Sequence, residues 1–206
     1  MTKSLQILIL LLIISFSPLR AEDYIITING TSKEIGLDQE TTLVLLDGTS
    51  LKLILQQKEY LRFNGDLFSF EHKSKYKPNR NDLGDGVFQT MIFTPLGTGV
   101  LVQEYIQMNP INLVDMMLNE LTKEEVEYGY KYSEKAVTKK AGDIRFNGKQ
   151  AVTTYPGKEW TRSVLAYGEK DKGILIVTMI ERDNYKTERD LIEHLWKSIE
   201  LKNNIQ

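Results

Sequence analysis

The chain has 206 residues, of which 41% are hydrophobic and 26% are charged, and its formal net charge at pH 7 is −2. This slightly acidic balance argues against nucleic acid as a partner, because phosphate binding requires a concentrated basic surface. The sequence contains no cysteine, which excludes thiol catalysis and thiolate-bound metals.

Residues 1–21 have the pattern of a secretory signal peptide that is cleaved after Ala21. Lys3 supplies the positive start, Leu5–Phe16 is an apolar run, and Pro18 follows it. The run is shorter than the roughly 20 residues that a membrane-spanning helix needs. We therefore predict a periplasmic or secreted protein with no stable membrane anchor after cleavage, the alternative being an uncleaved N-terminal anchor. An exported chain without disulfides is typical of a bacterial envelope.

Residues 22–63 predict an N-terminal β-strand module. The pairs Asn-Gly at 29–30 and Asp-Gly at 47–48 are typical of hairpin turns between strands. The stretch after the second pair alternates with the period of a strand, with leucines on one face at Leu51, Leu53 and Leu55. Such a small set of strands either packs on the rest of the chain or forms a module that precedes it.

Residues 64–206 predict strands interrupted by two helices. Asn109 and Pro110 are suited to open the first helix, and Gly129 is suited to end it. Its apolar stripe comprises Leu113, Val114, Met117, Leu118 and Leu121. The second helix follows Thr187, which with Asp190 resembles a capping box, and its stripe comprises Leu191, Ile192, Leu195, Trp196 and Ile199.

The strands between the two helices are joined by short turns. Asn147-Gly148 predicts a tight turn, and the segment around Gly173 predicts another. Ile174–Ile180 is the most apolar strand of the presumed mature chain, which is typical of a central strand covered on both faces. Tight turns make successive strands antiparallel. We therefore predict an α+β fold, in which an antiparallel β-sheet is flanked by helices.

The order and character of these segments are similar to the PsbP-like α/β/α sandwich family. The resemblance covers residues 64–206 and includes the segments LFSFEHKSKYKP, VFQTMIFTP, GVLVQEY, NPINLVDMM, FNGKQAVTTYP, GILIVTMIE and LIEHLWKSI. The family includes photosystem assembly proteins, a Ran-binding nuclear import factor and many exported bacterial proteins of unknown role. The resemblance implies a non-enzymatic role in protein binding or assembly, and it carries over no catalytic residue.

The sequence motifs do not predict a catalytic, cofactor or metal site. Gly97-Thr98-Gly99 precedes a strand rather than a helix, so it predicts a hairpin and not a phosphate-binding loop. No G-x-S-x-G elbow is present. The candidates for carboxylate chemistry are Asp82, Asp85 and Glu104, together with the pair Glu181 and Asp183. The two histidines, His72 and His194, are expected to be structural.

The remaining candidate is an interaction surface formed by Tyr128, Tyr130, Tyr132 and Trp160. Exposed aromatic residues anchor protein interfaces, although the same residues could instead cap the sheet edge and core. The favoured hypothesis is an exported, non-enzymatic binding or assembly-assisting domain whose partner is another envelope protein. One alternative is an envelope hydrolase that uses Glu104, Asp82, Asp85 and His72, with or without a metal. Another is an immunity-type inhibitor of a toxin.

Overall fold

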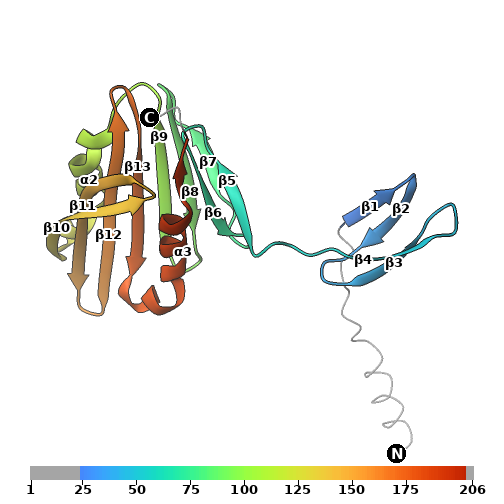
Figure 1. Cartoon of the computed structure of the whole chain (residues 1–206). Helices are drawn as coiled ribbons and strands as arrows, with labels where there is room; N and C mark the ends of the chain where they lie inside the picture. The colour runs from blue at the N-terminus through green and yellow to red at the C-terminus, as the bar shows by residue number, and fades with distance from the viewer. Residues whose placement is uncertain (1–23, 203–206) are drawn as a thin grey trace, which may run out of the picture. The chain divides into compact units, whose positions relative to one another are not determined.

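The computed structural model describes residues 24–202, so the predicted signal peptide and its cleavage site lie outside the described residues. The chain divides into two compact units, Met1–Lys58 and Glu59–Gln206 (Figure 1). In the part that is described, no helix is long and apolar enough to cross a membrane.

The first unit consists of two β-hairpins. β1 (Tyr24–Ile28) pairs with β2 (Thr31–Ile35), and β3 (Glu40–Val44) pairs with β4 (Ser50–Ile54). Both predicted turns are confirmed. Asn29 and Gly30 have φ of 48° and 79°, as a two-residue hairpin turn with two left-handed positions requires, and Gly48 has φ of 83°.

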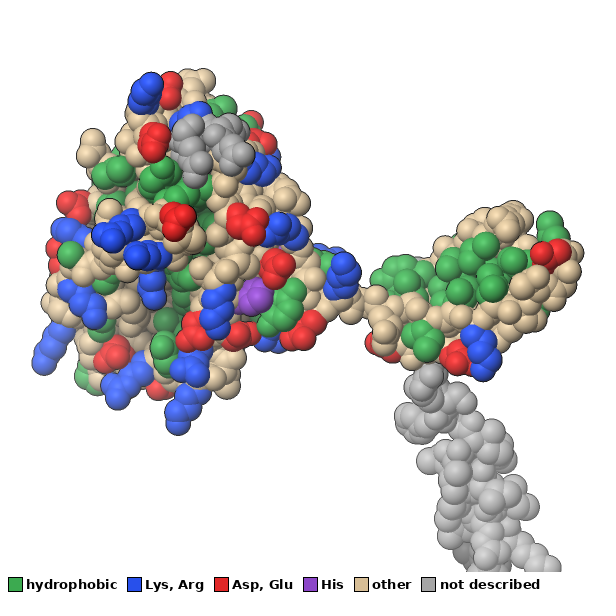
Figure 2. Space-filling model, viewed as in Figure 1, with side chains coloured by type: hydrophobic (Ala, Val, Ile, Leu, Met, Phe, Trp, Pro, Cys, Tyr) green, Lys and Arg blue, Asp and Glu red, His purple; other side chains and the backbone are tan. Residues whose placement is uncertain are grey.

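The first unit has a very small core. Its only buried large apolar side chains among the described residues are Ile35 and Leu43, each 2% exposed. Figure 2 shows hydrophobic side chains gathered on the surface of this unit. The exposed large hydrophobic residues of this unit are Tyr24, Ile25, Val44, Leu46 and Ile54.

The boundary between the units lies earlier than the sequence predicted. We expected the N-terminal module to end at residue 63, whereas the units divide between Lys58 and Glu59. β5 (Tyr60–Asn64) belongs to the second unit because it pairs along its whole length with β6 (Phe68–Lys73).

The second unit is built on a seven-stranded antiparallel sheet in the order β10-β11-β12-β13-β9-β8-β7 (Figure 1). In chain order the strands are β7 (Asn79–Asp82), β8 (Val87–Phe93), β9 (Gly99–Tyr105), β10 (Lys131–Ala141), β11 (Ile144–Tyr155), β12 (Lys158–Glu169) and β13 (Lys172–Glu181). A smaller sheet consists of β5, β6 and β14 (Glu200–Leu201).

Both faces of the large sheet are covered at β13. Ile174 and Ile176 lie in a core cluster with residues of α3 (Tyr185–Ser198) and of β6, whereas Leu175 and Val177 pack with α2 (Val114–Tyr128) on the opposite face. All four side chains are fully buried. The prediction of a central strand covered on both faces is therefore confirmed.

The predicted fold class, an α+β sandwich with helices flanking the sheet, is wrong. Strands make up 55% and helices 20% of the described residues, and these residues contain only two α-helices. The protein is therefore a mostly antiparallel β-rich fold. The physical reason is that α3 does not cover its face alone, because the small sheet contributes Phe68 and Phe70 to the same core cluster.

The observed ends of the two helices match the ends predicted from the sequence only in part. Asn109 Oδ1 accepts a hydrogen bond from the backbone N–H of Ile111 at 3.1 Å, opening a short 3₁₀ turn, η1 (Pro110–Leu113), that leads into α2. Gly129 ends α2 with φ of 102°. The predicted capping box of the last helix is wrong. α3 follows the 3₁₀ turn η2 (Arg182–Asn184), and Thr187 lies inside α3, where its hydroxyl donates to the carbonyl of Asn184.

Candidate functional site

Three tyrosines meet at the C-terminal end of α2. Tyr128 is the last residue of α2, Tyr130 immediately precedes β10, and Tyr155 is the last residue of β11. The rings of Tyr130 and Tyr155 stack with their centroids 4.9 Å apart, and the ring of Tyr128 lies 5.6 Å from Tyr155 and 6.2 Å from Tyr130. These separations are those of favourable aromatic pairs. We call these three residues the tyrosine cluster.

The tyrosine cluster lines an open cleft of about 550 Å³. Tyr128 is 72% exposed and Tyr155 is 39% exposed, so two of the three rings are accessible to a partner. The other lining residues are Glu124, Glu125, Pro156 and Lys158. The cleft therefore combines a broad aromatic surface with charged side chains of both signs.

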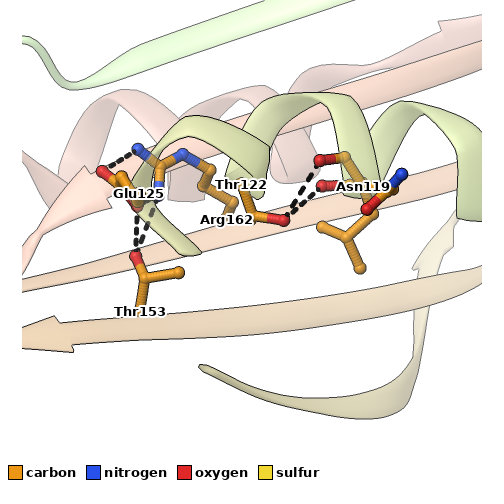
Figure 3. Close-up of polar contacts among 6 residues, drawn as sticks. Asn119, Thr122, Glu125, Thr153 and Arg162 are labelled. Atoms are coloured by element: carbon orange, nitrogen blue, oxygen red, sulfur yellow. Dashed lines mark hydrogen bonds and ion pairs between the residues drawn. The ribbon is translucent and has the colours of Figure 1, made fainter. Parts of the chain in front are cut away.

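An ion pair beneath the cleft joins α2 to the sheet (Figure 3). Arg162 of β12 donates from Nη1 to Glu125 Oε2 and from Nη2 to Glu125 Oε1, both at 2.7 Å. Thr153 of β11 donates its hydroxyl to Glu125 Oε2 at 2.5 Å. Bidentate pairs of this kind are strong and geometrically specific. Glu125 lies one turn before Tyr128, so this network, which we call the Glu125 network, fixes the helix end that carries Tyr128.

The Glu125 network also controls the charge state of its carboxylate. Burial alone would raise the pKa of Glu125, but the hydrogen bonds from Arg162 and then Thr153 outweigh it and hold this pKa below its ordinary value. Glu125 is therefore ionised at neutral pH, as the bidentate contact with Arg162 requires.

The structure separates the four residues of the predicted interaction surface. Tyr128 and Tyr130 lie together in the tyrosine cluster. Tyr132 instead lines a second cleft, described below, and Trp160 lies with its ring 5.3 Å from the guanidinium of Arg162. Tyr155 was missing from the predicted surface. The signal that would have found it is the pairing of β10 with β11, which places Lys131 opposite Thr154 and so brings Tyr130 beside Tyr155.

The second cleft, of about 620 Å³, lies between α2 and the start of β10. Three of its charged groups form ion pairs, because Lys149 Nζ lies 2.9 Å from both Asp115 Oδ1 and Glu134 Oε1. The hydroxyl of Tyr132 donates to Glu134 Oε2 at 2.5 Å. Burial, and then this hydrogen bond, raise the pKa of Tyr132 to about 12. The hydroxyl therefore keeps its proton at neutral pH, and it is held by Glu134.

Glu104 anchors a turn. It is fully buried, and its Oε2 accepts from the backbone N–H of Leu67 at 2.6 Å. Arg80 lies 3.2 Å from Glu104 Oε1 and 2.7 Å from Asp66 Oδ2, so it connects the carboxylate to the turn between β5 and β6. Burial of a charge requires this kind of pairing.

The other residues of the hydrolase hypothesis do not converge on Glu104. Asp82 accepts from the backbone N–H of Gly84, and Asp85 is an exposed loop residue with φ of 50°. His72 is the penultimate residue of β6, at the end opposite to Leu67, and its Nδ1 lies 3.0 Å from the carbonyl of Lys73. Within residues 24–202, no group of three or more His, Asp or Glu side chains is placed to hold a metal ion.

The second histidine and the glycine-rich loop have structural contacts. His194 of α3 stacks on Tyr60, with the ring centroids 4.0 Å apart, and its Nε2 lies 3.4 Å from Glu71 Oε2. The segment containing Gly97 is a hairpin turn between β8 and β9, as predicted. The backbone N–H of Thr94 donates to the carbonyl of Thr98, and Gly97 has φ of 88°.

Comparisons with known proteins assign no family. No protein-family model matches the chain, and no curated protein matches it. A crystal structure from Bacteroides thetaiotaomicron VPI-5482 superposes with a TM-score of 0.43 at 13% sequence identity. The match covers 73% of this chain and 50% of that protein, so this chain spans about half of its length. Likeness at this level supports no argument about function, and the resemblance to the PsbP-like family stays a prediction.

Proposed function

We propose that this protein is an exported bacterial binding or assembly-assisting domain without chemistry of its own, and that it holds another envelope protein at the tyrosine cluster. The export part of the proposal rests on the pattern of residues 1–21. The binding part rests on one observation: in an open cleft, Tyr130 and Tyr155 stack on each other beside Tyr128, and the rings of Tyr128 and Tyr155 are exposed.

The physical argument concerns what tyrosine contributes to an interface. A tyrosine ring provides a large contact area and a polar tip while losing little conformational entropy on binding. Tyr130 and Tyr155 already hold each other in place by stacking, so less order has to be imposed when a partner binds. The Glu125 network keeps the helix end that carries Tyr128 in a fixed position.

Site-specific photocrosslinking in intact cells tests the proposal. A photoreactive phenylalanine analogue at position 128 should form a discrete crosslinked product with one envelope protein. The same analogue at position 185 should not, although Tyr185 of α3 is also exposed. Tyr155→Ala should reduce the yield from position 128 by about tenfold or more, as expected for an aromatic interface anchor.

Tyr132→Phe is the matched control for this experiment, because Tyr132 lies outside the tyrosine cluster. It should leave the crosslinking yield unchanged. Equal products from positions 128 and 185, or none from position 128 in an exported and folded protein, would contradict the proposal. The identity of the crosslinked protein separates assembly assistance from toxin inhibition, since a toxin would be recovered only in the latter case.

A further inference from the structure

β10 is a long and open edge of the large sheet. It is the terminal strand, and among the described residues it pairs only with β11. All 11 of its residues pair in one continuous register, from Lys131 opposite Thr154 to Ala141 opposite Ile144, so no bulge interrupts it. An edge strand presents a row of backbone N–H and C=O groups that can pair with another chain.

The opposite edge of the same sheet is better protected. β7 at that edge has only 4 residues, Asn79–Asp82, all of them polar. Proteins protect sheet edges with short strands, prolines, bulges or charged side chains. β10 is long, contains no proline and has no bulge, and its charges are therefore the only such device that it carries.

The charges of β10 are mostly positive and mostly unpaired. Lys131, Lys135 and Lys139 are spaced by four residues, which places them on one face of the strand. All three side chains are exposed, and none of them makes a hydrogen bond or ion pair with another described residue. Figure 2 shows lysine and arginine side chains gathered at the left of the second unit, where Figure 1 places β10 and β11.

We propose that β10 is a docking edge for an extended acidic segment of a partner protein, which adds to the sheet as a further antiparallel or parallel strand. Backbone pairing supplies the attachment, and the row of lysines selects a strand with acidic side chains at every fourth residue. The site begins next to Tyr130 but includes none of the three residues of the tyrosine cluster.

The charge of β10 disfavours a second copy of this chain as the occupant. The strand contains four lysines and one glutamate, a net charge of +3. The glutamate, Glu134, is already engaged by Lys149 and Tyr132. Pairing two copies of β10 would therefore bring two positive strands together, whereas an acidic strand would neutralise each one.

Binding of a designed peptide to the purified full chain tests the proposal. The probe is the fluorescently labelled, end-capped nonapeptide Glu-Thr-Val-Thr-Glu-Thr-Val-Thr-Glu, and the matched probe has lysine in place of each glutamate. Fluorescence anisotropy should detect binding of the acidic peptide only. The double variant Lys135→Glu/Lys139→Glu should weaken its binding by about tenfold or more, because two attractive pairs become repulsive. Lys135→Arg/Lys139→Arg should retain it.

Methylation of the peptide backbone separates strand addition from simple charge attraction. Alternate amides of a strand point to opposite sides, so N-methylation of one alternate set should abolish binding and N-methylation of the other should not. The Tyr128→Ala variant should bind the peptide unchanged, which separates this site from the tyrosine cluster. The proposal would be overturned by no binding of the acidic peptide, by equal binding of the two methylated peptides, or by a dimer that Lys135→Glu/Lys139→Glu dissociates.

Discussion

Arg162 supports the candidate interaction surface without being part of it. Its guanidinium is buried under α2 and holds both oxygens of Glu125, one turn from Tyr128. If Arg162 were lost, a largely buried carboxylate would remain without its charge partner, which is the costly way to break such a pair. The Glu125 network therefore couples the stability of the second unit to the geometry of the tyrosine cluster.

Glu125→Gln should reduce the acid sensitivity of the protein. The pKa of Glu125 is lower in the folded state than its ordinary value of 4.5, so its stabilising contribution is complete above about pH 4.5 and is lost as the pH falls through the folded-state pKa. At pH 7 the variant should unfold with a free energy lower by about 2 kcal/mol, because an amide has only one acceptor oxygen and cannot accept from both Nη1 and Nη2 of Arg162. This difference should shrink as the pH is lowered. Urea unfolding from about pH 7 to pH 3 measures it.

Glu127→Gln is the matched control for this pH series, since Glu127 is an exposed residue of the same helix. Its free energy of unfolding should equal that of the wild type at every pH. If the free energies of unfolding of the wild type and of Glu125→Gln differed by the same amount at every pH, the pKa of Glu125 would be the same in the folded and unfolded states.

The residues of the candidate surface were only partly predictable from the sequence. Tyr128 and Tyr130 are neighbours in the chain, so their grouping needed no knowledge of the fold. Tyr155 joins them only through strand pairing between β10 and β11. The bond between Glu125 and Arg162 likewise joins residues on different elements, and no local pattern indicates which of the many charged side chains will be paired.

At the scale of elements, the Asn147-Gly148 pair shows how a strong local signal can be overridden. Asn-Gly is typical of a hairpin turn, but both residues lie inside β11, and the predicted turn there is wrong. The turn between β10 and β11 is formed by Gly142 and Asp143 instead, with φ of 58° at Gly142. Glycine is needed at position 148 for close strand packing and not for a turn. A Cβ at this position would collide with the carbonyl oxygen of Val164 in β12.

Gly148→Ala should therefore destabilise the second unit strongly, by about 3 kcal/mol, because the obstacle is neighbouring backbone that cannot move aside. Gly129→Ala is the informative comparison. Gly129 has open space around its Cα but a φ of 102°, so alanine there should cost only about 1 kcal/mol. Equilibrium unfolding in denaturant gives both values. Equal losses at the two positions would argue against a close approach of β11 and β12 at Gly148.

At the scale of the whole molecule, periodicity located both α-helices but not the β-rich fold class. The apolar stripes of α2 and α3 can be read from the sequence because helices are local structures. The small sheet cannot, since it is completed by pairing of Glu200 with Ser69 and of Leu201 with Phe68, which are far apart in the chain. This pairing is what places β6 beside α3 over the large sheet. The sequence therefore predicted both helices but not the small sheet that shares a face of the large sheet with the last helix, α3.

The two units should differ in their ability to fold alone. Every member of both core clusters belongs to the second unit, whereas Ile35 and Leu43 are the only large apolar side chains buried in the described part of the first. The described part of the first unit, residues 24–58, has no cysteine and is shorter than the usual limit for independent stability.

We expect a protein beginning at Glu59 to keep the thermal midpoint of the second unit within about 2 °C. A peptide of residues 24–58 should show the circular dichroism of an unfolded chain. A midpoint that falls by 5 °C or more, roughly 1 to 2 kcal/mol for a chain of this size, would instead mean that the first unit contributes to the stability of the second.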